Sequence, residues 1–534
     1  MTTTTAPAEL ARPRLSHRQI LLLMGGLMTG MLLAALDQTI VGTALPTIVG
    51  KLGGINHYSW VVTAYLLAST ASTPLYGKIS DLYGRRPILI FAIMVFMIGS
   101  LAAGASQNMT ELIAFRAIQG LGAGGLMTLA FTIVSDVVAP RERGRYMGIF
   151  GAVFGVSSVA GPLVGGYFAE HNWRWIFYLN VPLAILAVIV CYWVLRLVPH
   201  QRRDHKIDYL GAVFMVASVV SLLIALSFGG STAGWAWSST KVIGLFVAAV
   251  VLAVIFIFVE GKAAEPILPL RLFKRLTFSI SSAATFILGF AMFGSIIFVP
   301  LYLQIVKGAS PTKSGLLMLP MMVGVISTSI ITGRMISKAG RYKWYPVVGT
   351  GLMAAGLLMF TLLHVNTPLW QAFIYMLVVG VGLGSAMQPL VLAVQNDLDL
   401  RDMGAGTAAS TFFRSLGGAV GVAALGAVLS NKLAAASSGG GPKISINSPA
   451  SIAALPETAR SMVQHLFVNA LHPIFLTAGL VTVLALLLSL AMPNKELKGA
   501  GTPPPAADDA KPSLESEDDE LAAIEMEAKA STML

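Results

Sequence analysis

The chain has 534 residues, of which 55% are hydrophobic and only 11% are charged. A soluble globular domain carries about 25% charged residues, so this composition excludes a soluble protein and predicts that lipid is the main solvent. At about 20 residues per membrane-spanning helix, the apolar residues suffice for roughly fourteen spans. The single cysteine, Cys191, lies inside an apolar run, so we expect neither a disulfide framework nor a metal site.

The formal net charge of +11 does not indicate a nucleic-acid partner, because the Lys and Arg residues flank apolar runs instead of forming one patch. The first apolar run has no small-residue cleavage site and exceeds signal-peptide length. We therefore expect no cleavable signal.

The apolar runs predict six spans, then two, then six. A basic tail (1–18) precedes a first bundle over 19–198, with spans near 19–48, 58–77, 87–106, 110–138, 145–169 and 175–197. Basic linkers and two extra spans, near 208–228 and 241–260, occupy 199–275. A second bundle over 276–492 has spans near 276–305, 313–336, 344–364, 368–396, 404–431 and 468–492.

Two segments lie outside these spans. Residues 433–467 are expected to be an outer loop, with an amphipathic stretch near its end. The Pro-rich and then acidic tail, 493–534, is expected to be disordered. The predicted fold class is thus an all-α integral membrane protein with two six-helix bundles and two extra spans between them.

A short charged segment at 77–87 is repeated in degenerate form at 333–341. Gly77 and Gly84 are seven residues apart, as are Gly333 and Gly340, and an arginine follows the second glycine in each copy. The repeat indicates two related halves. Because Lys and Arg accumulate on the cytoplasmic side, we predict that both copies and both termini are cytoplasmic, with the chain spanning the cytoplasmic membrane many times.

The first copy also suggests a charge network that holds the spans in one conformation. This conformational latch is expected to comprise Gly77, Asp81, Gly84, Arg85 and Asp136. The alternative is ordinary topology-setting charge. The second copy has Ser337 where the first has Asp81, so its latch should be weaker.

Few charges lie within the apolar spans, where each costs several kcal/mol unless it is paired or faces water. At about 1.5 Å per residue, Asp37 lies roughly 16 Å below the outer end of the first span, and Arg116 roughly 10 Å below that of the fourth. The two could therefore form a pair, with Gln38 and Gln119 as polar neighbours.

Two roles are open for the Asp37–Arg116 pair. Burial favours a neutral carboxyl group and a nearby arginine favours a charged one, so rearrangement of the neighbours can move a proton on and off Asp37. A cationic substrate could also compete for this carboxylate. The alternative is a static ion pair that joins helices.

Arg414 is a second intramembrane cation, with Gln388, Gln395 and Asn396 as candidate partners. In the fifth span, small residues four apart and Pro162 predict close helix packing and a bend, either for packing alone or for an outer gate. The glycine–proline residues concerned are Gly155, Gly161, Pro162, Gly165 and Gly166.

These motifs resemble the major facilitator superfamily, specifically its fourteen-span drug:proton antiporter branch, over about residues 16–495. Residues 77–86 resemble its cytoplasmic loop signature and 333–341 a degenerate second copy. Residues 36–46, 116–125, 155–166 and 173–182 resemble motifs of the branch, with Gly42 where asparagine would be expected. Asp397, Asp399 and Asp402 cluster at a span end, which argues against divalent substrates.

The resemblance implies a monomeric, proton-driven exporter of amphipathic, cationic or neutral drugs that works by alternating access, with the proton gradient in place of a cofactor. Two alternatives stay open: export of a lipid, antibiotic or metabolite made by the cell, and a non-transporting membrane sensor. An enzyme is not expected, because no nucleophile–base cluster or metal-ligand spacing occurs.

Overall fold

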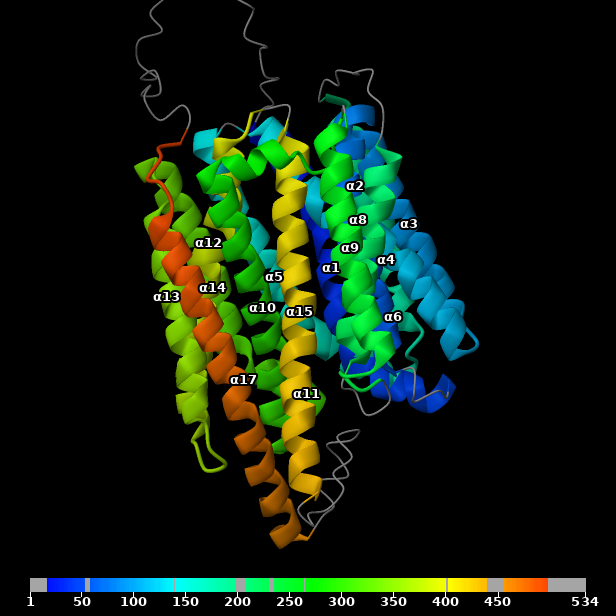
Figure 1. The fold of residues 1–534 in the computed structure, drawn as a ribbon, viewed down its shortest axis with the longest axis vertical. Coiled ribbons are helices and arrows are strands. Elements are labelled where there is room, and N and C mark those ends of the chain that lie inside the picture. Colours follow the sequence, from blue (N-terminus) through cyan, green and yellow to red (C-terminus); the bar gives the residue numbers. More distant parts are fainter. Residues whose placement is uncertain are drawn as a thin grey trace, which may run out of the picture. The chain divides into compact units, whose positions relative to one another are not determined.

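The computed structural model describes residues 17–52, 58–138, 140–197, 208–229, 235–263, 265–399, 402–438 and 456–497, and these ranges are almost entirely helical (Figure 1). Thirteen described helices are long and apolar enough to cross a membrane. α2 (Tyr58–Tyr83) is a further long helix whose Ser and Thr residues make it less apolar. The predicted all-α membrane fold is confirmed. Most of the N-tail, the linker 198–207 and the tail beyond residue 497 lie outside the described residues.

The first bundle contains α1 (His17–Leu52), α2, α3 (Arg85–Ala105), α4 (Met109–Val137) and α5 (Pro140–His171). It is completed by α6 (Trp175–Tyr178), α7 (Asn180–Val194) and the short η2 (Leu195–Leu197), so the expected sixth span is interrupted at Leu179. Glycines let α4 approach two neighbours closely. A β-carbon on Gly122 would lie 2.6 Å from the Ala92 carbonyl oxygen of α3. A β-carbon on Gly124 would likewise meet atoms of α2.

The two extra spans are α8 (Tyr209–Phe228) and α9 (Thr240–Lys262), followed by the short η3 (Leu270–Lys274). α8 packs against α2 of the first bundle and α15 of the second through Leu67, Val219, Leu223 and Phe412. α9 is largely exposed, with apolar side chains such as Ile257 and Phe258 on its surface, as expected of a helix in contact with lipid.

The second bundle contains α10 (Leu276–Ile305), α11 (Pro311–Leu317), α12 (Leu319–Ala339), α13 (Trp344–Met359) with η4 (Phe360–Leu362), α14 (Leu369–Asp397), α15 (Met403–Ser438) and α17 (Glu457–Ala491). The expected span 313–336 is two helices that meet at Met318, because Pro320 lacks the N–H that would continue α11.

The expected outer loop, 433–467, is helical at both ends. α15 continues to Ser438 and α17 already begins at Glu457. The amphipathic stretch forms the first turns of α17 because it buries Val463, Phe467 and Val468 in the core of the second bundle. Residues 439–455 lie outside the described residues.

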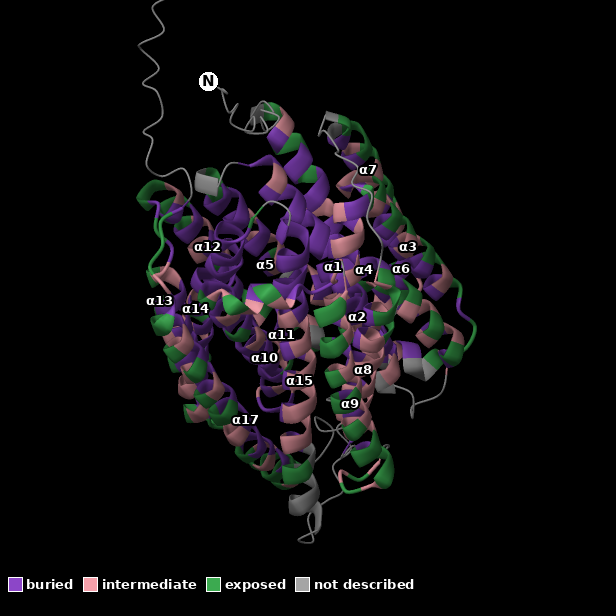
Figure 2. Ribbon diagram, turned by 45° about the horizontal axis from the view of Figure 1, so that its top comes forward, coloured by how far each residue is buried: buried purple, intermediate pink, exposed green. Residues whose placement is uncertain are grey.

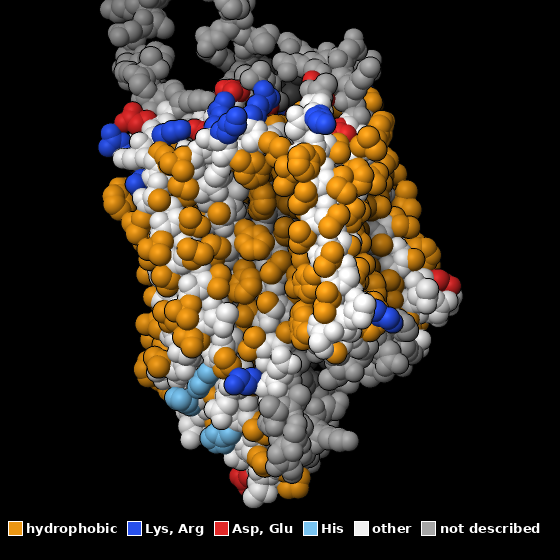
Figure 3. Space-filling view, in the orientation of Figure 1, with side chains coloured by type: hydrophobic (Ala, Val, Ile, Leu, Met, Phe, Trp, Pro, Cys, Tyr) orange, Lys and Arg blue, Asp and Glu red, His pale blue; other side chains and the backbone are white. Residues whose placement is uncertain are grey.

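The helices are buried mainly where they face one another (Figure 2). α4 and α14 are buried along most of their length. Lys and Arg side chains gather at one end of the helices, above a wide apolar band (Figure 3). We call this the basic end; it carries both repeated segments, and the other is the opposite end.

Candidate functional site

Asp37 and Arg116 form a buried ion pair between α1 and α4, each about 1% exposed. The Gln119 amide donates to Asp37 Oδ1 at 2.9 Å, and its Oε1 accepts from Arg116 at 2.8 Å. Asn180 of α7 also donates to Asp37 Oδ1, at 3.0 Å. The carboxylate thus accepts hydrogen bonds from three side chains.

The surroundings of this group hold its members in place. The Arg116 guanidinium lies 4.1 Å from the centre of the Tyr65 ring, and the Tyr65 hydroxyl donates to the Ala34 carbonyl oxygen. Asn180 also donates to Ser100 Oγ. Gln38, expected as a polar neighbour of the pair, interacts with the Tyr65 hydroxyl. Removing one member of such a buried pair typically costs about 3–5 kcal/mol.

The latch residues come together at the basic end. Arg85 lies 2.5 Å from Asp81 and donates from Nε to Asp136 at 2.7 Å, joining α2, α3 and α4. Gly84 separates α2 from α3 with φ 98°, a conformation that favours glycine. All these residues belong to the first bundle.

The same segment touches the second bundle. The Asp81 carboxylate occupies the space where a β-carbon on Gly404 would lie, at the N-terminus of α15. Gly77 lies against Gly404 and Ala408. The partial positive charge of a helix N-terminus attracts a carboxylate, so this contact favours association of the two bundles at the basic end.

The second copy makes the corresponding contact with α5. A β-carbon on Gly333 or Gly144 would meet the other residue's carbonyl oxygen, and the Arg145 amide donates to Ser337 Oγ at 3.1 Å. Gly340, like Gly84, has a positive φ (69°). Both copies therefore join the two bundles.

The ion pairs around the second copy differ from those of the first. Arg341, the counterpart of Arg85, pairs with Glu496 at 2.8 Å, and both side chains are largely exposed. The neighbouring acidic residues are also paired: Asp397 with Lys495, and Asp399 with Arg275 at 2.6 Å. At the basic end of the second bundle, the ion pairs therefore involve residues that follow α17, namely Lys495 and Glu496, or that precede α10, namely Arg275.

The glycine–proline helix α5 connects the bundles along their length. Gly161 and Gly165 lie against Thr39 and Ile40 of α1, and Thr39 Oγ1 donates to the Ser157 carbonyl oxygen at 3.0 Å.

On its other side, α5 faces the second bundle. Gly155 packs on Ile326 of α12, Gly166 lies beside Thr312, and Gly315 contacts the Pro162 ring. α5 is therefore placed to carry a movement of α1 to the second bundle.

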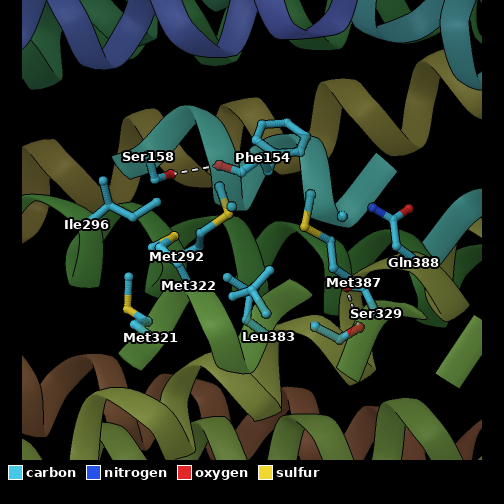
Figure 4. A pocket seen from close by; sticks show the side chains of 14 residues that line it. Phe154, Ser158, Met292, Ile296, Met321, Met322, Ser329, Leu383, Met387 and Gln388 are labelled. Carbon is cyan, nitrogen blue, oxygen red and sulfur yellow. Dashed lines mark hydrogen bonds between the residues drawn. The ribbon is translucent and has the colours of Figure 1, made fainter. Parts of the chain in front are cut away.

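A narrow cavity lies between α5, α10, α12 and α14 (Figure 4). It is small, with about 30 Å³ of free space inside it. Its lining is mostly methionine, aromatic and aliphatic, and methionine side chains and Phe154 face the same space. Flexible thioethers suit a site that adapts to differently shaped apolar molecules.

Three polar side chains line this cavity. Ser158 and Ser329 donate to backbone carbonyl oxygens. Gln388 is 4% exposed, and neither polar atom of its amide has a hydrogen-bond partner in the structure.

Arg414 of α15 is buried where the two bundles meet. Its guanidinium lies 5.3 Å from the ring centre of Phe154 and 5.9 Å from that of Phe131, and Nη2 lies 3.6 Å from Met127 Sδ. None of the three expected partners bonds it. Gln395 reaches the Phe131 carbonyl oxygen and Thr407, Asn396 the carbonyl oxygen of Glu496, and Gln388 is unpartnered.

The aromatic contacts do not fully compensate this cation. Each cation–π contact contributes about 0.5–2 kcal/mol, and these two are near the outer limit of about 6 Å. Placing an arginine at the centre of a membrane costs at least about 2.5–3.5 kcal/mol. Among the described intramembrane residues, Arg414 is thus a charged side chain whose burial is offset by no opposite charge.

Comparison with known proteins agrees with this arrangement. The model of the family described as "Major Facilitator Superfamily" matches residues 27–208 and 191–422. The chain belongs to the major facilitator superfamily. It is accordingly a membrane transporter and not an enzyme.

Relatives within the superfamily cover most of the chain. An uncharacterized MFS-type transporter of Mycobacterium tuberculosis (strain CDC 1551 / Oshkosh) is 41% identical over 92% of this chain and 72% of its own. Multidrug transporter protein MdtP of Bacillus subtilis is 43% identical, over 76% of this chain and 75% of its own. Multidrug resistance protein 3 of the same species is 36% identical, over 89% of this chain and 95% of its own. The solved structure of the proton:xylose symporter XylE shares the fold, with TM-score 0.61 at 14% identity over 90% of this chain and 98% of that one.

The structure thus brings together two predicted groups, Asp37 with Arg116 and Gln119, and Asp81 with Arg85 and Asp136. Sequence reasoning did not assign a role in this group to Asn180. The available signal was a polar residue at the start of an otherwise apolar span.

Proposed function

We propose that this chain is a proton-coupled exporter that moves amphipathic compounds out of the cell across the cytoplasmic membrane by alternating access. The buried group around Asp37 carries the proposal, because it places a carboxylate inside the membrane-spanning part of the bundle, bonded to Arg116, Gln119 and Asn180. The names of the Bacillus relatives, a multidrug transporter and a multidrug resistance protein, support the efflux part.

In this proposal, a proton reaching Asp37 neutralises the carboxylate and releases Arg116, Gln119 and Asn180 to reorient. The rearrangement displaces α1 relative to α4 and α7. Because α1 hydrogen-bonds to α5 through Thr39, and α5 packs on α12, the displacement is passed to the second bundle. Proton binding on one side and cargo binding on the other thereby favour different arrangements of the two bundles.

The basic end faces the cytoplasm in this proposal, with both termini on that side, as the distribution of Lys and Arg indicates. The contacts of Asp81 with α15 and of Ser337 with α5 then close the cytoplasmic side. One chain supplies both bundles and the cavity, so we propose that the monomer is the transporting unit.

The test is uptake of an amphipathic dye into proteoliposomes with an imposed pH gradient, comparing wild type, Asp37→Asn and the matched control Asp399→Asn. Asp399 pairs at the surface with Arg275 and should tolerate the change. We expect gradient-driven uptake by wild type and the control, and only downhill dye exchange by Asp37→Asn. Unchanged gradient-driven uptake by Asp37→Asn would refute the coupling role.

A further inference from the structure

Arg414 differs from Arg116, the buried arginine of the first bundle that pairs with Asp37. Arg116 has the Asp37 carboxylate, whereas no described carboxylate lies within 4 Å of Arg414. Arg414 is only 4% exposed, and its guanidinium contacts the Met127 thioether and the rings of Phe131 and Phe154. A buried guanidinium without an anion is a ready site for one.

Arg414 and the central cavity share a boundary. Phe154 lines the cavity, and its ring also lies against the Arg414 guanidinium. Phe154 is only half-buried, and its ring is the shared contact between the cavity and the guanidinium. Figure 4 shows Phe154 and Gln388 on the cavity wall, the latter with its amide unpartnered.

The cavity has no negatively charged side chain that would pair with a cation. Its lining residues include no Asp or Glu. Asp37 already pairs with Arg116 and is only 1% exposed. A cationic head group would instead be repelled by the unpaired Arg414, and weak screening inside the membrane makes that repulsion long-ranged.

We propose that Arg414 and Gln388 form the head-group site for an amphipathic anion, a carboxylate or sulfonate attached to an apolar body. The guanidinium binds the anionic oxygens, the Gln388 amide donates a further hydrogen bond, and the apolar body lies among Met292, Met322 and Met387. This assignment specifies the cargo of the proposed exporter and so rests on that function. This cargo differs from the cationic or neutral drugs that the family resemblance implies.

The experiment compares two fluorescent probes that differ only in the anionic group, anilinonaphthalene sulfonate and its uncharged analogue phenylnaphthylamine. Binding to the full-length protein in neutral-lipid nanodiscs is measured without any gradient, after subtraction of empty discs. The variants are Arg414→Gln, Arg414→Lys and Gln388→Leu. The matched control is Arg18→Gln, an exposed arginine at the start of α1.

Wild type and the control should bind the sulfonate more tightly than the neutral probe. Loss of a charge-assisted hydrogen bond weakens binding by about tenfold or more, so Arg414→Gln should weaken the sulfonate by at least that factor and leave the neutral probe nearly unchanged. Arg414→Lys should restore part of the sulfonate affinity. Gln388→Leu keeps the charge and should weaken the sulfonate severalfold, which preserves the test if Arg414→Gln does not fold.

Equal effects of Arg414→Gln on both probes, or no effect on either, would overturn the head-group site, as would tighter binding of the neutral probe by wild type. Because no gradient is present, this result is separate from that of the proposed function. Sulfonate selectivity without proton-driven export would refute the coupling alone. Export by way of Asp37 without sulfonate selectivity would refute the head-group site alone.

Discussion

Replacing Asp81 by asparagine removes the charge that faces the N-terminus of α15 while preserving the shape of the side chain. The pair with Arg85 lies within the first bundle and does not itself join the two bundles. Arg85 also keeps Asp136 as a partner in the variant. The change therefore acts mainly on the contact between Asp81 and α15.

A carboxylate at a helix N-terminus contributes about 0.3–1 kcal/mol when exposed and up to about 2 kcal/mol when partly buried. The Asp81 side chain is 16% exposed, so we expect a loss of about 1–2 kcal/mol. Such a loss shifts the equilibrium between closed and open basic ends by a factor of about 5–30.

The population shift can be measured as a distance distribution between spin labels on cysteines introduced at Tyr83 and Lys338. These exposed positions lie at the basic ends of α2 and α12, and the native Cys191 is buried. Asp81→Asn should enlarge the long-distance population and impair transport more than Ser337→Ala. Glu496→Gln, which breaks an exposed pair, should change little. An unchanged distribution in Asp81→Asn, or a larger effect of Ser337→Ala, would refute the latch.

Three further substitutions follow from the packing and hydrogen bonds. Gly404→Ala places a β-carbon against the Asp81 carboxylate, so it should open the basic end in the same distance measurement; a distribution like that of wild type would contradict the contact. Gly122→Ala overpacks the α3–α4 contact and should cost about 1–3 kcal/mol in a denaturant titration, whereas Gly244→Ala, with no atom within 4 Å of the added carbon, should be neutral. Asn180→Ala removes one hydrogen-bond donor to Asp37 and should change the pH profile of transport; a profile identical to that of wild type would separate Asn180 from proton transfer.

Much of the fold could be predicted because membrane spans are long apolar runs and the repeated segment relates the two halves. The interruptions could not, because they depend on single residues. α12 begins at Leu319 with Pro320 in its first turn, and α7 begins at the polar Asn180 after a turn at Leu179. The early start of α17 depends on burial of Val463 and Phe467, which only the packed bundle supplies.

The part of the site that contains two opposite charges could be predicted from the sequence. The surroundings of Arg414, which has no carboxylate partner among the described residues, could not. An intramembrane carboxylate and arginine at similar depth have a strong reason to meet, as Asp37 and Arg116 do. For Arg414 the sequence offered only candidate amide partners, and the structure places it against Phe131 and Phe154. Rotation about a helix axis is poorly specified when apolar residues surround the helix on every side.

The coupling of cargo to protons is tested most directly by recording both fluxes together. Proteoliposomes are loaded with cargo and a trapped pH indicator, and cargo is allowed to leave down its own gradient. Wild type should move protons in the opposite direction in step with the cargo, while Asp37→Asn should exchange cargo without any proton movement. A proton flux in Asp37→Asn equal to that of wild type would contradict the assignment of Asp37 as the coupling group.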